Sequence, residues 1–310
     1  MSSLSPWLRL TPDPSPSRAR GRAGLGGEAL RVATTMKLAV LLLLIACGPS
    51  KPAAKVGAAP AALDDVWQPL SYGGYLPPKE LRASVDVIFH FHAARAVESE
   101  YRAAALNAVV VSFQLSGLGT TPYWDAMNDP NAFENMKAEL VRSMRARTGH
   151  DVAIGRIALV AWSAGYASVQ RILVQQRHYD EVDALFLLDA LHTGYAPTTN
   201  NTKRANLVTV APFVRFAKDA VLGKKLFVFT HSSILPEGYA STKEVADAFA
   251  EDLGLKWTSE PRPGPPGAMR SADSGDAHLR GWDGTTARDH VIHDHFIDEV
   301  IATWLAPRWK

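Results

Sequence analysis

The chain has 310 residues, of which 47% are hydrophobic and 21% are charged, a balance that indicates a globular protein and excludes a disordered or collagen-like one. Its formal net charge is +2, but six basic and only two acidic residues lie before residue 47, so 27 basic and 29 acidic residues remain from there onward. Because no cluster of Lys and Arg interleaved with aromatic residues follows, nucleic acid is not expected as a partner.

The first 46 residues lack the features of a folded domain. Residues 1–35 are rich in Pro, Ser, Gly and Arg and show no apolar periodicity, so we expect them to be disordered. The basic start Met36-Lys37 precedes an unbroken apolar run over 38–45. This run is too short to span a bilayer but suits the core of a signal peptide, which we predict over 36–46.

The signal peptide ends in Leu44-Ile45-Ala46-Cys47, which resembles a bacterial lipobox. The resemblance implies cleavage before Cys47 and acylation of its thiol, which would hold the protein on a membrane of the bacterial cell envelope. Cys47 has no disulfide partner in the chain because it is the only cysteine. The resemblance also implies that translation starts at residue 36, with residues 1–35 as an over-extended reading frame. Residues 47–66, rich in Pro, Ala and Lys, are expected to be a flexible tether.

Apolar strand patterns alternate with amphipathic helix patterns over residues 67–310, which we predict to be one domain. This alternation predicts an α/β fold with a doubly wound, mostly parallel sheet and helices on both faces. Strands are expected at 85–91, 108–113, 157–161, 184–189, 226–230 and 277–282, and helices at 99–105, 131–147, 166–173, 241–253 and 291–305.

Two stretches lack the regular alternation of the rest of the domain. Residues 196–225 form a long connection that contains the apolar, helix-like piece 207–222. This connection is either a plain crossover helix or a lid over a cleft. Residues 258–276 are rich in Pro and Gly and are expected to be an irregular surface loop.

The most informative motif lies between the third predicted strand and its helix, where the chain reads Ala161-Trp162-Ser163-Ala164-Gly165. The motif is a variant of the G-x-S-x-G nucleophile elbow with Ala at the first position. A sharp strand-to-helix turn would expose the Ser163 hydroxyl to a base, and the small residues on both sides would let strand and helix approach closely. We therefore predict Ser163 to be a nucleophile.

With this motif, most of residues 67–310 resembles the α/β-hydrolase superfamily, in which the serine is followed along the chain by an acid and then by a histidine. Ser163, Asp189 and His290 reproduce this order. Asp189 ends an apolar strand at its carboxyl end, where open α/β sheets carry functional groups. His290 lies between the last predicted strand and the last predicted helix, as the histidine of the family does. His293 is the alternative base.

Two further histidines, His231 and His295, remain less favoured candidates for the base. The resemblance places the oxyanion-binding amides at Ala164 and at Ala93, which lies in the loop after the first predicted strand. His92 next to it is expected to be structural. The implied reaction is hydrolysis of an ester, amide or thioester, from a small-molecule or lipid-like substrate, with no metal or organic cofactor.

Two other interpretations remain open at this point. His90 and His92, taken as lying on one face of a strand, could join His290, His293 and His295 in a metal-dependent hydrolase. Alternatively, the chain could be a lipid-anchored binding or scaffold protein that keeps the fold and has lost the chemistry.

Overall fold

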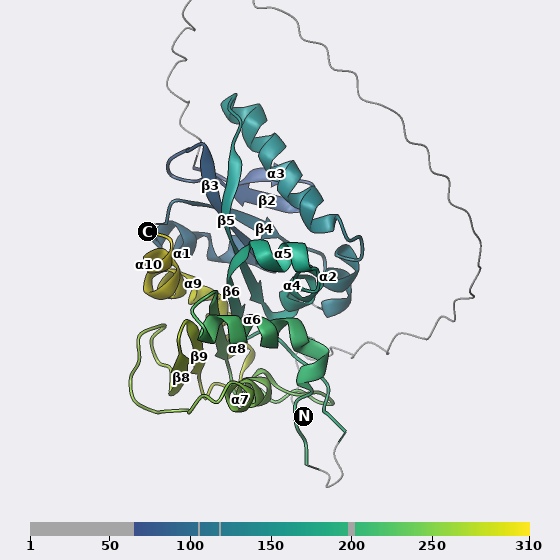
Figure 1. The fold of residues 1–310 in the computed structure, drawn as a ribbon, viewed down its shortest axis with the longest axis vertical. Helices are drawn as coiled ribbons and strands as arrows, with labels where there is room; N and C mark the ends of the chain where they lie inside the picture. Colours follow the sequence, from purple (N-terminus) through teal and green to yellow (C-terminus); the bar gives the residue numbers. More distant parts are fainter. Residues whose placement is uncertain (1–64, 105, 118, 198–201) are drawn as a thin grey trace, which may run out of the picture. The chain divides into compact units, whose positions relative to one another are not determined.

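The computed structural model describes residues 65–310 apart from 105, 118 and 198–201 (Figure 1). The predicted signal peptide, Cys47 and nearly all of the predicted tether lie outside these residues. The described strands are β1 (Gln68–Leu70), β2 (Gly73–Leu76), β3 (Ser84–Phe91), β4 (Ala108–Phe113), β5 (Ala153–Trp162), β6 (Val182–Leu188), β7 (Leu226–His231), β8 (Arg270–Ser274) and β9 (Ala277–Gly281).

The helices connect these strands in the alternating manner that the sequence predicts. They are α1 (Glu98–Ala103), α2 (Thr120–Ala126), α3 (Ala132–Thr148), α4 (Tyr166–Leu173), α5 (Gln176–Glu181), α6 (Ala211–Val221), α7 (Thr242–Asp252), α8 (Ala287–His295), α9 (Ile297–Val300) and α10 (Ala306–Arg308). Short 3-10 turns are η2 (Ala94–Val97), η3 (Ser163–Gly165) and η4 (Leu207–Val210), and η5 (Ile301–Leu305) is a π-helical turn. Among these described helices, none is long and apolar enough to cross a membrane.

The described strands form one nine-stranded mixed sheet in the order β1-β2-β4-β3-β5-β6-β7-β9-β8. β2 runs antiparallel to β1 and β4, and β8 runs antiparallel to β9. Every other neighbouring pair is parallel. The α/β class and the mostly parallel sheet are therefore as predicted.

Two apolar layers cover the two faces of this sheet. Phe89 and Leu159 face the layer that contains α3, α4, α6 and α7, whereas Ile88 and Val160 face the layer that contains α1, α9 and η5. In Figure 1, α9 and α10 accordingly lie on the opposite side of the strands from α4 and α5. Burial on both faces explains why the central strands read as unbroken apolar runs.

The two stretches without regular alternation, residues 196–225 and 258–276, differ in outcome. Phe213 and Phe216 of α6 are fully buried in the core, so the described part of the long connection is a crossover helix packed on the sheet. The expectation of an irregular loop over 258–276 is wrong in part, because Arg270–Ser274 forms β8. Its register against β9 joins Arg270 to Gly281 and Ser274 to Ala277.

The last helical region starts earlier than predicted. A capping box at Thr286 and Asp289 begins α8 at Ala287, so His290 lies inside the helix and not before it. A capping box of the same kind, formed by Ser241 and Glu244, begins α7.

Candidate active site

Ser163 occupies a strained turn between β5 and α4. The backbone is still extended at Trp162 (φ −103°, ψ 140°) and then reverses at Ser163, whose φ is +49°. A residue with a side chain in this left-handed region costs about 1–3 kcal/mol and persists only where its surroundings enforce it. The predicted sharp turn from strand to helix is therefore present, and it leaves Ser163 half-buried.

Gly165 makes this turn possible. A Cβ atom at position 165 would lie 2.0 Å from the carbonyl oxygen of Phe91, a backbone atom that has no room to withdraw. The start of α4 consequently packs directly against the end of β3. This contact also places the loop after β3, which contains His92 and Ala93, beside the serine turn.

Asp189 directly follows β6 at its carboxyl end. It is the second residue of the site with a left-handed backbone conformation, with φ of +43°. Its carboxylate is 2% exposed and satisfied on both oxygens. Oδ1 accepts hydrogen bonds from the Ser232 amide (2.8 Å) and the Thr242 hydroxyl (2.6 Å), and Oδ2 lies 2.7 Å from Nδ1 of His290. Burial alone would raise the pKa of Asp189, but the imidazoles of His293 and His290 and the Ser232 amide hold it well below its usual value.

His290 lies beside the serine turn because Trp162 holds it there. The indole N–H of Trp162 donates to the carbonyl oxygen of His290 (3.1 Å), and the two rings stack with centroids 4.8 Å apart. With Nδ1 donating to Asp189, Nε2 of the neutral ring is the nitrogen that can accept a proton. Among the described residues, none hydrogen bonds to the hydroxyl of Ser163, and this includes His290, whose contact with the serine turn is through Trp162.

The same indole stacks on a second imidazole. The rings of His92 and Trp162 are nearly parallel, with centroids 4.9 Å apart, and Nδ1 of His92 hydrogen bonds with the Tyr123 hydroxyl (2.7 Å). Burial, with smaller contributions from His90 and His290, lowers the pKa of His92 to about 4. A neutral His92 adds no positive charge beside His290, and its contacts match the structural role predicted for it.

The loop after β3 carries the predicted donor at Ala93. His92 and Ala93 both adopt left-handed backbone conformations, with φ of +79° and +64°, although neither is glycine. The Ala93 N–H donates to the side-chain carbonyl of Gln114 (2.5 Å), which is exposed. The Ala93 amide is therefore paired with Gln114 in this structure. Ala164, the other predicted donor, is the second residue of η3, directly after Ser163, and is 2% exposed.

The other candidate bases have different partners. His293 is fully buried, with Nδ1 hydrogen-bonded to the Thr230 hydroxyl (2.8 Å). His295 pairs with Glu100, and His231 lies between the Ser232 carbonyl oxygen and the Arg270 guanidinium. In this arrangement His290 is the candidate base that contacts Asp189.

His90 and His92 do not share one face of the strand, contrary to the expectation behind the metal-dependent alternative. His90 hydrogen bonds with Tyr101 of α1 (2.9 Å) and lies 3.2 Å from Asp294 of α8, whereas His92 contacts Tyr123 of α2. The left-handed backbone at His92 interrupts the alternation that a strand would impose. Within the described part of the chain, the group able to hold a metal ion consists of Glu134, His178 and Glu181, and none of the predicted histidines belongs to it.

Sequence reasoning missed three residues that build the site. Ser232 and Thr242 satisfy Oδ1 of Asp189, and Trp162 stacks on the imidazoles of His92 and His290. Thr242 directly follows a cap residue that was visible in the sequence, but its hydroxyl contact with a residue 53 positions away was not.

No protein-family model matches the chain, and no curated protein matches it at a significant level.

Buried histidines make the stability of the fold sensitive to acid. Burial is the main cause that lowers the pKa values of His92, His231 and His293 from 6.5 to about 4. The unfolded chain then binds more protons than the folded chain between these pH values. The contribution of these histidines to the free energy of unfolding is thus fully present above about pH 6.5. It declines toward pH 4, by roughly 2 kcal/mol or more per pH unit near pH 5.

Urea unfolding at several pH values between 7.5 and 4.5 measures this decline. We expect His293→Asn to make it shallower and the exposed control His150→Gln to leave it unchanged. A free energy of unfolding that stays constant from pH 6.5 to pH 5 would contradict the expectation.

Proposed function

We propose that this chain is a serine hydrolase with an α/β-hydrolase fold that cleaves an ester, amide or thioester through an acyl-enzyme. Ser163 is the nucleophile, His290 the general base and acid, and Asp189 the residue that orients the imidazole. The observation that carries the proposal is the strained residue Ser163 directly after Trp162, whose indole stacks on a histidine with Nδ1 2.7 Å from a buried carboxylate. In the α/β-hydrolase arrangement, the second oxyanion donor comes from the loop after the third strand, which is the position of Ala93.

The mechanism follows from these positions. The Ser163 oxygen attacks the carbonyl carbon of the substrate while Nε2 of His290 removes its proton. Asp189 stabilises the resulting imidazolium, and the amides of Ala164 and Ala93 donate to the oxyanion of the tetrahedral intermediate. Collapse expels the alcohol, amine or thiol, which takes the proton from His290. Water, deprotonated by the same imidazole, then releases the acid and restores Ser163.

The substrate class rests on the same proposal. A small-molecule or lipid-like ester fits an acyl-enzyme mechanism that uses no cofactor. The lipobox resemblance at Cys47 supports a lipid-anchored location on a membrane of the bacterial cell envelope. Mass spectrometry of the native protein, which should find an acylated Cys47 at its N-terminus, tests this location separately.

Burst kinetics test the proposed reaction class. With an activated ester such as p-nitrophenyl butyrate, we expect a rapid release of about one equivalent of p-nitrophenolate per folded chain, followed by slower turnover. The burst reports formation of the acyl-enzyme, and the slow phase reports its hydrolysis. If a panel of activated esters and thioesters gave neither burst nor turnover above background with a well-folded sample, the scaffold interpretation would replace the proposal.

A further inference from the structure

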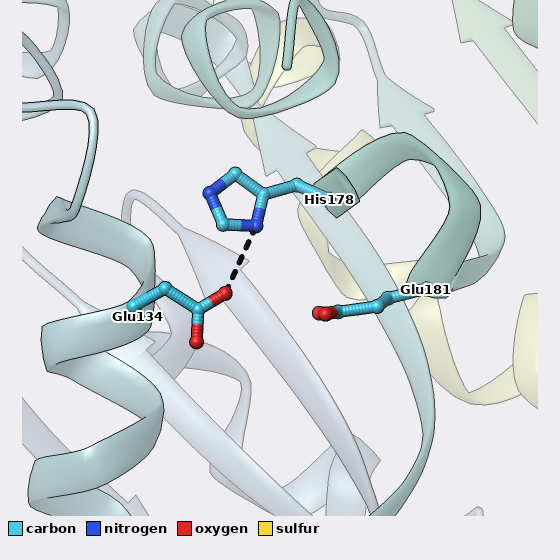
Figure 2. A group of neighbouring side chains, drawn as sticks. All are labelled: Glu134, His178 and Glu181. Carbon is cyan, nitrogen blue, oxygen red and sulfur yellow. Dashed lines mark ion pairs between the residues drawn. The ribbon is translucent and has the colours of Figure 1, made fainter. Parts of the chain in front are cut away.

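A second group of chemically capable side chains lies outside the Ser163 site, between α3 and α5. Glu134 belongs to the first turn of α3, and His178 and Glu181 lie three residues apart on α5. Each offers one ligand atom, and these atoms lie within 4.8 Å of one another. Figure 2 shows the His178 imidazole pointing at the Glu134 carboxylate, with the Glu181 carboxylate on the other side. Two helices thus direct one imidazole and two carboxylates at a common point.

The imidazole of His178 is buried without a hydrogen-bond partner. Its side chain is fully buried, and neither ring nitrogen has a hydrogen bond. Nδ1 lies 3.3 Å from Oε1 of Glu134 in a poorly aligned contact, and the Phe133 ring covers one edge of the imidazole. Buried polar groups without partners are rare and require an explanation. Burial also lowers the pKa of His178, which favours the neutral ring, the form that binds metal ions.

Lys137 shows that the carboxylates of this group already attract a cation. Its ammonium lies 2.9 Å from Oε1 of Glu134 and also contacts Glu181. An ammonium carries only donors. The ammonium of Lys137 makes no hydrogen bond with the His178 imidazole. Lys137 therefore balances the two carboxylates but leaves the lone pair of His178 unused. The Lys137 side chain is 12% exposed, so a metal ion would have to displace it from the two carboxylates.

We propose that Glu134, His178 and Glu181 bind a divalent transition-metal ion, with Zn²⁺ as the best fit, and that the Lys137 ammonium is its competitor. One imidazole, two carboxylate oxygens and a water molecule complete the four-coordinate shell that Zn²⁺ prefers. An imidazole ligand disfavours Mg²⁺ and Ca²⁺, which take oxygen ligands. The bound ion would join α3 to α5. This site is independent of the proposed hydrolysis, because it includes none of the residues assigned to that reaction.

Zinc titration of the chelator-treated full chain, in competition with a chromophoric chelator, tests the proposal. We expect one Zn²⁺ per chain, and a loss of affinity of about tenfold or more in Glu181→Gln. The Glu181 side chain is 41% exposed, so this variant removes a ligand without disturbing the core. Lys137→Met keeps the length of the side chain and removes its charge, and it should bind Zn²⁺ several-fold more tightly than the natural chain.

The Lys137→Met result separates a metal site from a set of ion pairs. If the group only links helices through Lys137, this variant loses stability and gains no zinc affinity. The exposed control His150→Gln should bind as the natural chain does, and crystals grown with Zn²⁺ should show anomalous scattering between Glu134 and His178. Absence of stoichiometric zinc binding, or binding that Glu181→Gln leaves unchanged, would overturn the proposal.

Discussion

Replacement of Ser163 by alanine is expected to lower kcat for activated esters by a factor on the order of 10⁴ or more. The reason is that the acyl-enzyme can no longer form, and only the oxyanion donors and substrate binding remain to assist attack by water. Steady-state hydrolysis of p-nitrophenyl butyrate, normalised to the folded fraction, measures the loss. Residual activity within tenfold of the natural chain would contradict the assignment of Ser163.

The strain at Ser163 supplies a control in which activity and stability change in opposite directions. Because its φ is +49°, Ser163→Gly should relieve the strain and raise the free energy of unfolding by about 1 kcal/mol while abolishing turnover. Urea unfolding of both variants checks this result. A destabilised glycine variant would show that the left-handed conformation carries no cost.

Replacement of Asp189 by asparagine is expected to lower kcat by a factor on the order of 10⁴ while the fold is retained. The side-chain oxygen of asparagine can still accept from Ser232 and Thr242. Its amide group, however, would donate to Nδ1 of His290 and would force the proton onto Nε2. The imidazole then cannot accept the proton of Ser163.

A second buried pair of histidine and aspartate in the chain offers a matched control. His90 of β3 and Asp294 of α8 lie 3.2 Å apart with side chains almost fully buried, and Asp294 lies four residues after His290 on the same helix. We expect Asp294→Asn to cost stability and to change kcat per folded molecule less than tenfold. Equal losses in the two variants would mean that the Asp189 effect is structural, and the assignment of His290 and Asp189 would fail.

The central part of the fold was predictable because tertiary burial and local pattern agree there. The strand expected at 108–113 is β4, and the helix expected from residue 166 is α4. The apolar run, the small residues and the amphipathic run around Ser163 all predict one strand, one turn and one helix. Gly165 shows why the small residue matters, since any side chain there would collide with Phe91.

The parts that were missed depend on contacts between distant residues. β1 and β2 are three and four residues long, and Gly73 and Gly74 in β2 give no apolar alternation. They become strands by pairing with each other and with β4. The different partners of His90 and His92 follow from a left-handed residue that side-chain spacing does not reveal. The early start of α8 could have been predicted from the Thr286 and Asp289 capping box.

Labelling with a fluorophosphonate probe, followed by peptide mass spectrometry, tests the role of Ser163 most directly. The probe phosphonylates a serine only where a base activates its hydroxyl and donors hold the phosphoryl oxygen. We predict one adduct per chain on the peptide that contains Ser163, and none on that peptide in Ser163→Ala or in unfolded protein. A folded natural chain that stays unlabelled, or that is labelled equally in Ser163→Ala, would contradict the proposed catalytic site.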